Sequence, residues 1–208
     1  MKKKTEPMLG PVPDISYIVS AYDRPEQLPV ILWALKCQTH RSLEVIVTDN
    51  ASNPKIVAAQ QKAVAQLEDP RFSYVHTFGK IEVSDCYWSA EYGAKRARGA
   101  WLCFPCDDTY LVPEFGHRML MAGLQNGWDL VICGDIIVGP ECNGRIGYKP
   151  WRMVPSRASK TTYIVRASAF PGFTNKPRVS GASLADYHLS GEVRNSGVLN
   201  GDFMVVHN

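Results

Sequence analysis

Short apolar runs of strand length alternate with stretches of helical periodicity along this chain, and no other feature constrains its fold as strongly. Most of these runs are continuous in Val, Ile, Leu and aromatic residues instead of alternating with polar ones. Strands of a parallel sheet have this composition, because helices cover both of its faces. The sequence therefore predicts an α/β fold, a mostly parallel sheet with helices on both faces.

The predicted strands are rich in β-branched and aromatic residues. They cover residues 15–20, 43–48, 72–77, 101–106, 129–133 with an extension over 135–138, 161–165 and 203–206.

The predicted helices lie between these strands. Leu28, Ile31, Leu32 and Leu35 form a stripe with the spacing i, i+3, i+4, i+7 of one helix face. Other helices are predicted from Lys55 to Leu67, from Ser84 or Asp85 to Arg98, from Pro113 to Gly127 and over 183–196. The helix that ends at Arg98 should pack closely on the sheet, because its inner stripe (Cys86, Ala90, Ala94, Ala97) is small.

Length and composition limit the class of protein. A chain of 208 residues can form one domain without a disulfide or a structural metal. Its 45% apolar and 21% charged residues are globular in composition, and a net charge of +3 is too small to indicate a nucleic-acid partner. We expect a flexible arm over residues 1–14 and one domain over 15–208.

No apolar stretch is long enough to span a membrane, and none follows Lys2–Lys4 in the manner of a secretory signal. We therefore expect a cytoplasmic protein with reduced cysteines. The three lysines are typical of a solubilising tail, with peripheral attraction to the inner face of a membrane as the alternative. Cys103 and Cys106 form a C-x-x-C motif, but residues three apart in a strand face opposite sides, so no metal or redox pair is expected there.

Polar residues follow three of the predicted strands directly. Ser20 to Arg24 end the first strand, Asp49 and Asn50 follow the second, and Asp107-Asp108-Thr109 follows the fourth. Ligands of open α/β sheets bind at the carboxyl ends of the strands, so these segments form the candidate site. Asp49 and Asn50 are also typical of a turn and helix cap, which is the alternative interpretation.

Asp107 and Asp108 repel each other unless a positive group lies near them. Hard oxygen ligands favour magnesium, manganese or calcium. The alternative is a helix-entry turn in which one carboxylate caps and the other is solvated. The chain contains neither a G-x-G-x-x-G motif nor a P-loop, so bound phosphates would need a metal to screen them.

Three segments carry a resemblance to a known family. Residues 15–24 (ISYIVSAYDR) are similar to an opening strand followed by a P-T-Y-N-R turn, and residues 43–52 (LEVIVTDNAS) are similar to E-I-I-V-V-D-D-G-S. Residues 94–109 (AKRARGAWLCFPCDDT) are similar to the A-x-G-E-Y-L-x-F-L-D-x-D-D segment that carries a DxD-type metal motif. Together these segments, which cover most of residues 15–115, resemble family 2 glycosyltransferases with the GT-A (Rossmann-like) fold.

The resemblance implies transfer of a sugar from a nucleotide diphosphosugar to an acceptor hydroxyl, usually with inversion. It implies a nucleotide-sugar-binding half over residues 15–115 and an acceptor and catalytic half over 116–208. The residues implied to bind the donor are Ser20, Ala21, Tyr22, Arg24, Asp49, Asn50 and Asp107. Asp108 would bind a divalent metal, Mn²⁺ or Mg²⁺. His207, which follows a predicted strand, would complete the metal shell, and a frayed terminal histidine is the alternative.

Asp186 is implied to be the general base that deprotonates the acceptor. The alternative is an acid favoured by the dipole at a helix N-terminus. The chain departs from the family pattern at three positions: Ala185 stands where many members have Glu, Cys106 replaces the first Asp of the metal motif, and Glu91 stands where many relatives have Asn. The last two leave the donor open, and Glu91 and Asp135 are the next candidates for the base.

The expected partners are a UDP-, GDP- or dTDP-sugar and a saccharide or lipid-linked acceptor. A basic stretch over residues 149–160 is predicted to be a solvated loop or a lid over the diphosphate. The loss of an acid at Ala185 keeps a second function open, a non-catalytic nucleotide-sugar binder or accessory subunit on the same fold. A nucleotidyltransferase would need a Gly- and Lys/Arg-rich first loop, which residues 20–24 do not supply. The oligomeric state stays open, a homodimer included.

Overall fold

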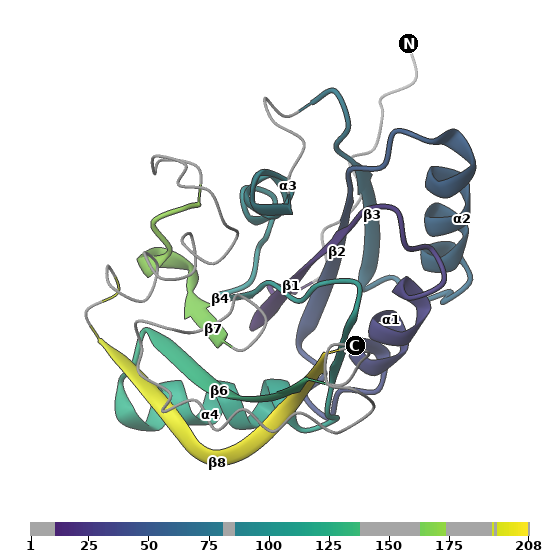
Figure 1. Ribbon diagram of the computed structural model, residues 1–208. Coiled ribbons are helices and arrows are strands. Elements are labelled where there is room, and N and C mark those ends of the chain that lie inside the picture. The colour runs from purple at the N-terminus through teal and green to yellow at the C-terminus, as the bar shows by residue number, and fades with distance from the viewer. Residues whose placement is uncertain (1–10, 81–85, 138–162, 174–192, 194, 208) are drawn as a thin grey trace.

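The computed structural model describes residues 11–80, 86–137, 163–173, 193 and 195–207 (Figure 1). Its eight-stranded sheet has the order β3-β2-β1-β4-β7-β6-β8-β5. The strands are β1 (Ile15–Ala21), β2 (Leu43–Asp49), β3 (Phe72–His76), β4 (Trp101–Cys103), β5 (Thr109–Leu111), β6 (Leu130–Ile137), β7 (Tyr163–Arg166) and β8 (Ser196–His207).

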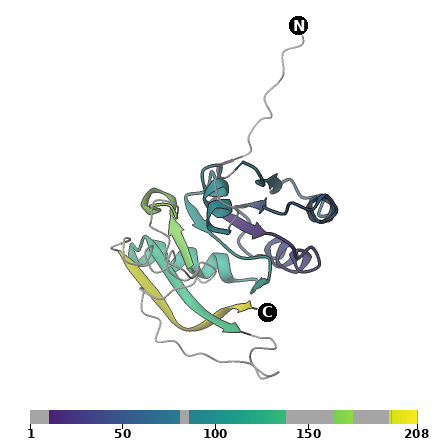
Figure 2. The ribbon, with the colours of Figure 1, turned by 45° about the horizontal axis from the view of Figure 1, so that its top comes forward.

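The sheet is mixed but mostly parallel, as the sequence predicts. β3, β2, β1 and β4 are parallel neighbours, and so are β6 and β8. β7 is antiparallel to both β4 and β6, and β5 is antiparallel to β8. β6 and β8 run side by side in two different views (Figures 1 and 2).

Helices lie on both faces of the sheet. The core on one face joins the strands to α1 (Leu28–Lys36), α2 (Pro54–Ala65) and α4 (Phe115–Asn126). The smaller core on the other face includes Ala90 of α3 (Cys86–Ala94). Figure 1 shows α1 and α2 on one side of β1–β3 and α3 on the other. The four residues of the predicted stripe on α1 are completely buried. No helix in the described ranges is long and apolar enough to cross a bilayer.

α3 packs closely on the sheet, as predicted: Ala90 of the predicted stripe is completely buried, Ala94 and Ala97 pack against the same core, and Gly93 adds a close contact. A Cβ atom on Gly93 would lie 2.5 Å from Ile18 Cγ2 and 2.8 Å from Thr48 Cγ2. Cys86, the first residue of the predicted stripe, is exposed. The helix ends at Ala94 and not at Arg98. The missing side chain of Gly93 and the small alanines together allow α3 to lie close to the strands.

The fourth predicted strand is shorter than expected. β4 ends at Cys103, and Cys106 makes only an isolated bridge with Ser20. Pro105 lies between them and has no N–H to donate to a ladder, although its carbonyl accepts the Ser20 N–H at 3.3 Å. A separate strand, β5, which the sequence analysis missed, begins at Thr109.

The C-terminal prediction was wrong at Ser196. The sequence analysis placed this residue at the end of a helix, but it begins β8, which runs to His207 and pairs with both β6 and β5. Val193 and Asn195 are not helical either, and the rest of that predicted helix lies outside the described residues. Long-range pairing with β6 outweighs the local pattern here, since a strand takes its stability from its neighbours in the sheet.

Candidate functional site

A pocket of about 230 Å³ opens at the carboxyl ends of β1 and β2. It brings together three segments that are far apart in the sequence, and α3 contributes to its wall. Its lining comprises six of the predicted donor-binding residues together with three others: Ser20, Ala21, Tyr22, Arg24, Asn50, Asp107, Cys86, Ser89 and Cys106.

Strand register explains why these segments meet. Ala21, the last residue of β1, pairs with Asp49, the last residue of β2. Asn50 N–H then donates to the Ala21 carbonyl at 3.1 Å, which holds the two strand ends together. The bridge between Ser20 and Cys106 brings the segment after β4 to the same edge. Parallel strands end at the same edge of a sheet, so polar residues placed after them converge.

Arg24 connects the first segment to the pair of carboxylates. Its Nη2 lies 2.5 Å from Asp107 Oδ1 and its Nη1 lies 2.7 Å from Asp108 Oδ2. Burial lowers the pKa of the Arg24 guanidinium, but the two carboxylates outweigh that effect and raise it. The positive group that the two acids require is thus supplied by the chain itself.

The two carboxylates differ in exposure. The Asp107 side chain is 1% exposed and that of Asp108 is 21% exposed. Asp107 Oδ2 also accepts the Tyr22 N–H at 3.3 Å, so both of its oxygens have partners within the site. Asp108 is therefore the carboxylate that a group entering from solvent reaches first.

Asn50 presents an unmatched acceptor. The residue is 4% exposed and lines the pocket, and its Oδ1 atom has no hydrogen-bond partner within the described ranges. A buried acceptor without a donor costs free energy, about 1–3 kcal/mol. A ligand with an N–H or O–H at this position would remove that cost.

Asp49 does not line the pocket. Its carboxylate accepts the Ala51 N–H at 2.7 Å and the Tyr74 hydroxyl. Burial raises the pKa of Asp49 and outweighs these two hydrogen bonds, which lower it. Burial and the contact with Asp49 raise the pKa of Tyr74 as well. In the structure, these hydrogen bonds of the Asp49 carboxylate fix the turn that positions Asn50.

Gln60 contributes to this region without having been predicted. It lies on α2, is completely buried, and its Nε2 donates to the Tyr22 carbonyl. Its Oε1 has no hydrogen-bond partner among the described residues. This hydrogen bond from α2 fixes the position of the loop after β1. The only indication in the sequence is a polar residue on a helix, which gives no reason to expect burial.

Of the two remaining predicted site residues, the structure describes the backbone of His207 but not Asp186. His207 ends β8, and the antiparallel register with β5 puts it opposite Thr109, the residue after Asp108. This register brings the backbone of His207 beside the carboxylate pair. Asp186 and the basic stretch 149–160 lie outside the described residues. Within the described part of the chain, no group of three or more His, Cys, Asp or Glu side chains is arranged to hold a metal ion.

Glu91, the reserve candidate for the base, is already engaged. It is buried, its Oε2 accepts the Phe173 N–H at 2.7 Å, and its Oε1 lies 3.0 Å from Lys95 Nζ. Gly172 has φ +85°, and a Cβ there would lie 3.2 Å from Glu91 Oε2. The structure uses Glu91 to position the segment around Gly172, beside a hollow of about 400 Å³.

Comparison with known proteins gives a consistent result. Residues 16–178 match the sequence model of the family described as "Glycosyl transferase family 2". A protein from Haemophilus influenzae described as an "uncharacterized glycosyltransferase" is 30% identical over 113 residues, which are 54% of this chain and 35% of that protein.

Several solved structures have the same fold. TarS 1-349 of S. aureus has a TM-score of 0.72 at 16% identity, over 94% of this chain and 60% of that one. The mannosyltransferase PcManGT from Pyrobaculum calidifontis, in complex with GDP-Man and Mn²⁺, has a TM-score of 0.72 at 15% identity, over 95% of this chain and 57% of that one. A third structure contains TarS 1-349 with UDP-GlcNAc and has a TM-score of 0.69 at 16% identity, over 93% and 58%. The chain thus spans about a third of the curated relative (35%) and about 60% of these structures.

Proposed function

This chain belongs to glycosyltransferase family 2, and we propose that it transfers a sugar from a nucleotide diphosphosugar to an acceptor hydroxyl, with a divalent metal and with inversion at the anomeric carbon. The observation that carries the proposal is the pocket at the carboxyl ends of β1 and β2, with Asn50 and the Arg24 fork in its wall.

The nucleoside is proposed to occupy this pocket. Asn50 Oδ1 needs a donor, and the imide N–H of a pyrimidine or the hydroxyls of a ribose supply one. Tyr22 is exposed at the rim, where its ring can stack on a base. The Tyr22 main chain is held on both sides, by Asp107 at its N–H and by Gln60 at its carbonyl. Such a fixed rim lowers the entropy cost of binding.

Arg24 is proposed to contact the diphosphate. Its guanidinium presents donors in a planar fork that suits phosphate as well as carboxylate. In the structure this fork is directed to Asp107 and Asp108, whose two negative charges exceed its single positive charge. These three side chains together carry one net negative charge, so a further cation at the mouth of the pocket would be stabilised.

A divalent metal is proposed to bind at this mouth. Asp108, whose oxygen is accessible, and His207, whose backbone lies opposite Thr109, are the residues that would hold Mn²⁺ or Mg²⁺. The ion, when bound, would stabilise negative charge on the departing diphosphate. The solved structure of PcManGT with GDP-Man and Mn²⁺ supports this assignment by analogy of fold.

Asp186 remains the proposed general base. A carboxylate that takes the acceptor proton contributes about 10²–10⁴-fold to the rate. Its position in the chain belongs to the proposed acceptor half, residues 116–208, with a saccharide or a lipid-linked sugar as the acceptor class. Attack by the deprotonated hydroxyl from the face opposite the diphosphate gives inversion.

The test separates donor binding from transfer. Binding of UDP, GDP and dTDP, and of their sugars, is measured by calorimetry with and without Mn²⁺, for the parent, Asn50→Ala and Asp108→Asn. Asp69→Asn is the matched control, because Asp69 lies at the other end of the sheet, before β3. We expect one nucleotide to bind, Asn50→Ala to weaken it with or without metal, and Asp108→Asn to remove only the metal dependence.

A transfer assay against saccharide and lipid-linked acceptors then decides the activity. Binding of no nucleotide by the parent would contradict the proposed pocket. Tight binding without transfer to any acceptor would favour the non-catalytic binder instead. A parent rate in Asp186→Asn would remove Asp186 from the proposal.

A further inference from the structure

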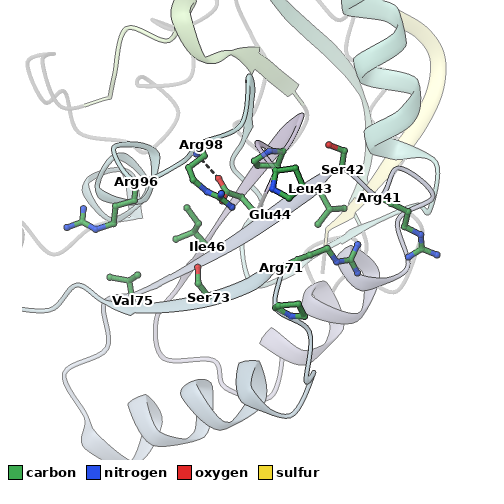
Figure 3. Close-up of a pocket in the computed structure, with 13 residues that line it drawn as sticks. Arg41, Ser42, Leu43, Glu44, Ile46, Arg71, Ser73, Val75, Arg96 and Arg98 are labelled. Carbon is green, nitrogen blue, oxygen red and sulfur yellow. Dashed lines mark hydrogen bonds and ion pairs between the residues drawn. The ribbon is translucent and has the colours of Figure 1, made fainter. Parts of the chain in front are cut away.

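A second groove, of about 780 Å³, lies at the opposite end of the sheet from the proposed donor pocket (Figure 3). It is lined by the first residues of β2, by one face of β3 and by the segments before β1, β2, β3 and β4. The residues are Pro11, Pro13, Arg41, Ser42, Leu43, Glu44, Ile46, Pro70, Arg71, Ser73, Val75, Arg96 and Arg98. Neither the sequence analysis nor the proposed function assigns a ligand to any of them.

Positive charge is concentrated in this groove. Its lining contains four arginines and one carboxylate, Glu44. Arg98 donates its main-chain N–H and its Nε to Glu44, at 2.6 and 3.0 Å, and Arg71 Nη2 lies 2.6 Å from Asp69 Oδ2. These two carboxylates balance two of the arginines. Within the described residues, the other two, Arg41 and Arg96, have no carboxylate of their own.

The two exposed arginines are held by main-chain carbonyls. Arg41 Nη1 donates to the Lys36 carbonyl at 3.1 Å, and Arg96 Nη1 donates to the Tyr92 carbonyl at 2.9 Å. Arg96 also lies 3.6 Å from the centroid of the Tyr92 ring. A neutral carbonyl orients a guanidinium without cancelling its charge, so both arginines are positioned and still cationic.

The arrangement of the arginines favours a long ligand over a compact anion. Arg96 and Arg41 lie at the two ends of the groove, and Arg98 and Arg71 lie between them (Figure 3). Single phosphate or sulfate ions are bound where guanidinium groups converge on one point. Here the charges are distributed along the groove.

The floor between the arginines is partly apolar and belongs to an edge of the sheet. Phe72 and Tyr74 of β3 pack toward the core, so Ser73 and Val75 alternate to the groove side, next to Ile46 of β2. β3 is the first strand of the sheet and has β2 as its neighbour. An edge strand can accept an extended peptide as a further strand, and alternate side chains of that peptide then lie on the groove side of the sheet.

We propose that this groove binds an extended segment of a partner polypeptide in which acidic residues alternate with apolar ones. The acidic side chains pair with Arg41 and Arg96 at the two ends, and the apolar ones cover Ile46 and Val75. The proposal is independent of the proposed function, since Leu43 and Glu44 begin β2 whereas Asn50 follows its other end. Occupation of the groove leaves the donor pocket open.

A fluorescent dodecapeptide of alternating Glu and Val is the probe, and its binding is measured by anisotropy. The variant Arg41→Gln/Arg96→Gln removes the two exposed charges without removing a carboxylate partner. Lys55→Gln/Lys62→Gln is the matched control, because both lysines are exposed on α2 and neither lines the groove. Ser73→Glu is a second test, since it adds a negative charge to an exposed position of the floor.

The parent and the lysine control are expected to bind the peptide equally, and a Lys-Val peptide is expected not to bind. The double arginine variant should bind about tenfold more weakly or worse, from two charge pairs of roughly 0.7 kcal/mol each. Ser73→Glu should also weaken binding. Absence of peptide binding by the parent, equal losses in the lysine control, or binding of phosphatidylglycerol vesicles in preference to the peptide would each overturn the proposal.

Discussion

The arginines at the two ends of the sheet differ in how they are paired with carboxylates. At the carboxyl end, one guanidinium, Arg24, is shared between Asp107 and Asp108. At the amino end, Arg71 and Arg98 each have a carboxylate of their own, and two further arginines have none within hydrogen-bond distance in the described structure. Among the described residues, the first end therefore has more carboxylate than guanidinium charge and is expected to attract cations, and the second has more guanidinium charge and is expected to attract anions.

This difference shows how one residue type serves two purposes on one fold. The number of carboxylates per guanidinium, and not the presence of arginine itself, decides which ligand each end attracts. Coulomb interactions at partly buried sites are stronger than in water, so an unbalanced charge has a larger effect at Asp107 and Asp108 than at the exposed Arg41 and Arg96.

The largest effect is expected for Asp107→Asn compared with Glu44→Gln. Both carboxylates are buried and each accepts from an arginine and from a main-chain N–H. Each change should lower the free energy of unfolding by about 1–3 kcal/mol, because buried donors lose a charged acceptor. Only Asp107→Asn should also abolish nucleotide binding.

Urea unfolding and nucleotide calorimetry on both variants check this prediction. A loss of nucleotide binding in Glu44→Gln as large as that in Asp107→Asn would show that stability alone controls the pocket, and the contrast between the two ends would disappear.

The next effect concerns α3, which packs on the sheet through Gly93. Gly93→Ala forces a Cβ into contact with Ile18 and Thr48, so we expect a loss of about 1–3 kcal/mol from overpacking. Gly127→Ala is the control, because its Cβ meets nothing within 4 Å and its cost comes only from φ +67°. Thermal unfolding of both variants checks this prediction, and Gly93→Ala should be the less stable of the two.

A smaller effect is expected for Arg24→Lys compared with Arg71→Lys. Lysine keeps the charge of each end but cannot form the planar two-pronged contact. Arg24→Lys should weaken nucleotide binding severalfold, about 1 kcal/mol, because one ammonium cannot reach both Asp107 and Asp108 as the fork does. Arg71→Lys should leave it unchanged. Equal nucleotide affinities in the two variants would mean that charge without fork geometry is sufficient.

The smallest effect is a difference in titration between two aspartates. Burial raises the pKa of Asp49, whereas the hydrogen bonds from Arg71 lower the pKa of Asp69. An acid with a raised folded pKa binds protons more readily when folded, so its contribution to stability falls as pH rises from the ordinary value of about 3.9 to the raised one. For Asp69 the contribution is complete above about 3.9 and is lost as pH falls through the lowered value.

Carboxyl ¹³C NMR titration of the folded protein measures both directions. We expect the midpoint of Asp49 above about 3.9 and that of Asp69 below it. Arg71→Gln should move the Asp69 midpoint up and leave Asp49 unaffected. A midpoint of Asp49 below the ordinary value would mean that its hydrogen bonds from Ala51 and Tyr74 outweigh burial.

Local pattern was sufficient for the first part of the sheet. β1, β2 and α1 lie where their apolar periodicity predicts them, because a buried parallel strand and an amphipathic helix each carry their environment in adjacent residues. The three-residue strand β5 and the long strand β8 were not predicted in this form. Their partners lie far along the chain, and the pairing of Thr109 with His207 cannot be inferred from either segment alone.

The sequence by itself determined the strand-helix alternation and the polar residues at the strand ends. The tertiary structure alone decided how those residues are used. Successive side chains of a strand and the residue after it point in different directions, so Asn50 lines the pocket while Asp49 beside it holds Tyr74 and Ala51. Arg24 and Asp107 are 83 positions apart, and the parallel pairing of β1 with β4, continued by the bridge between Ser20 and Cys106, brings them within 2.5 Å. Residue type and position are local properties of a chain, but the partner of a charge depends on which strands lie together.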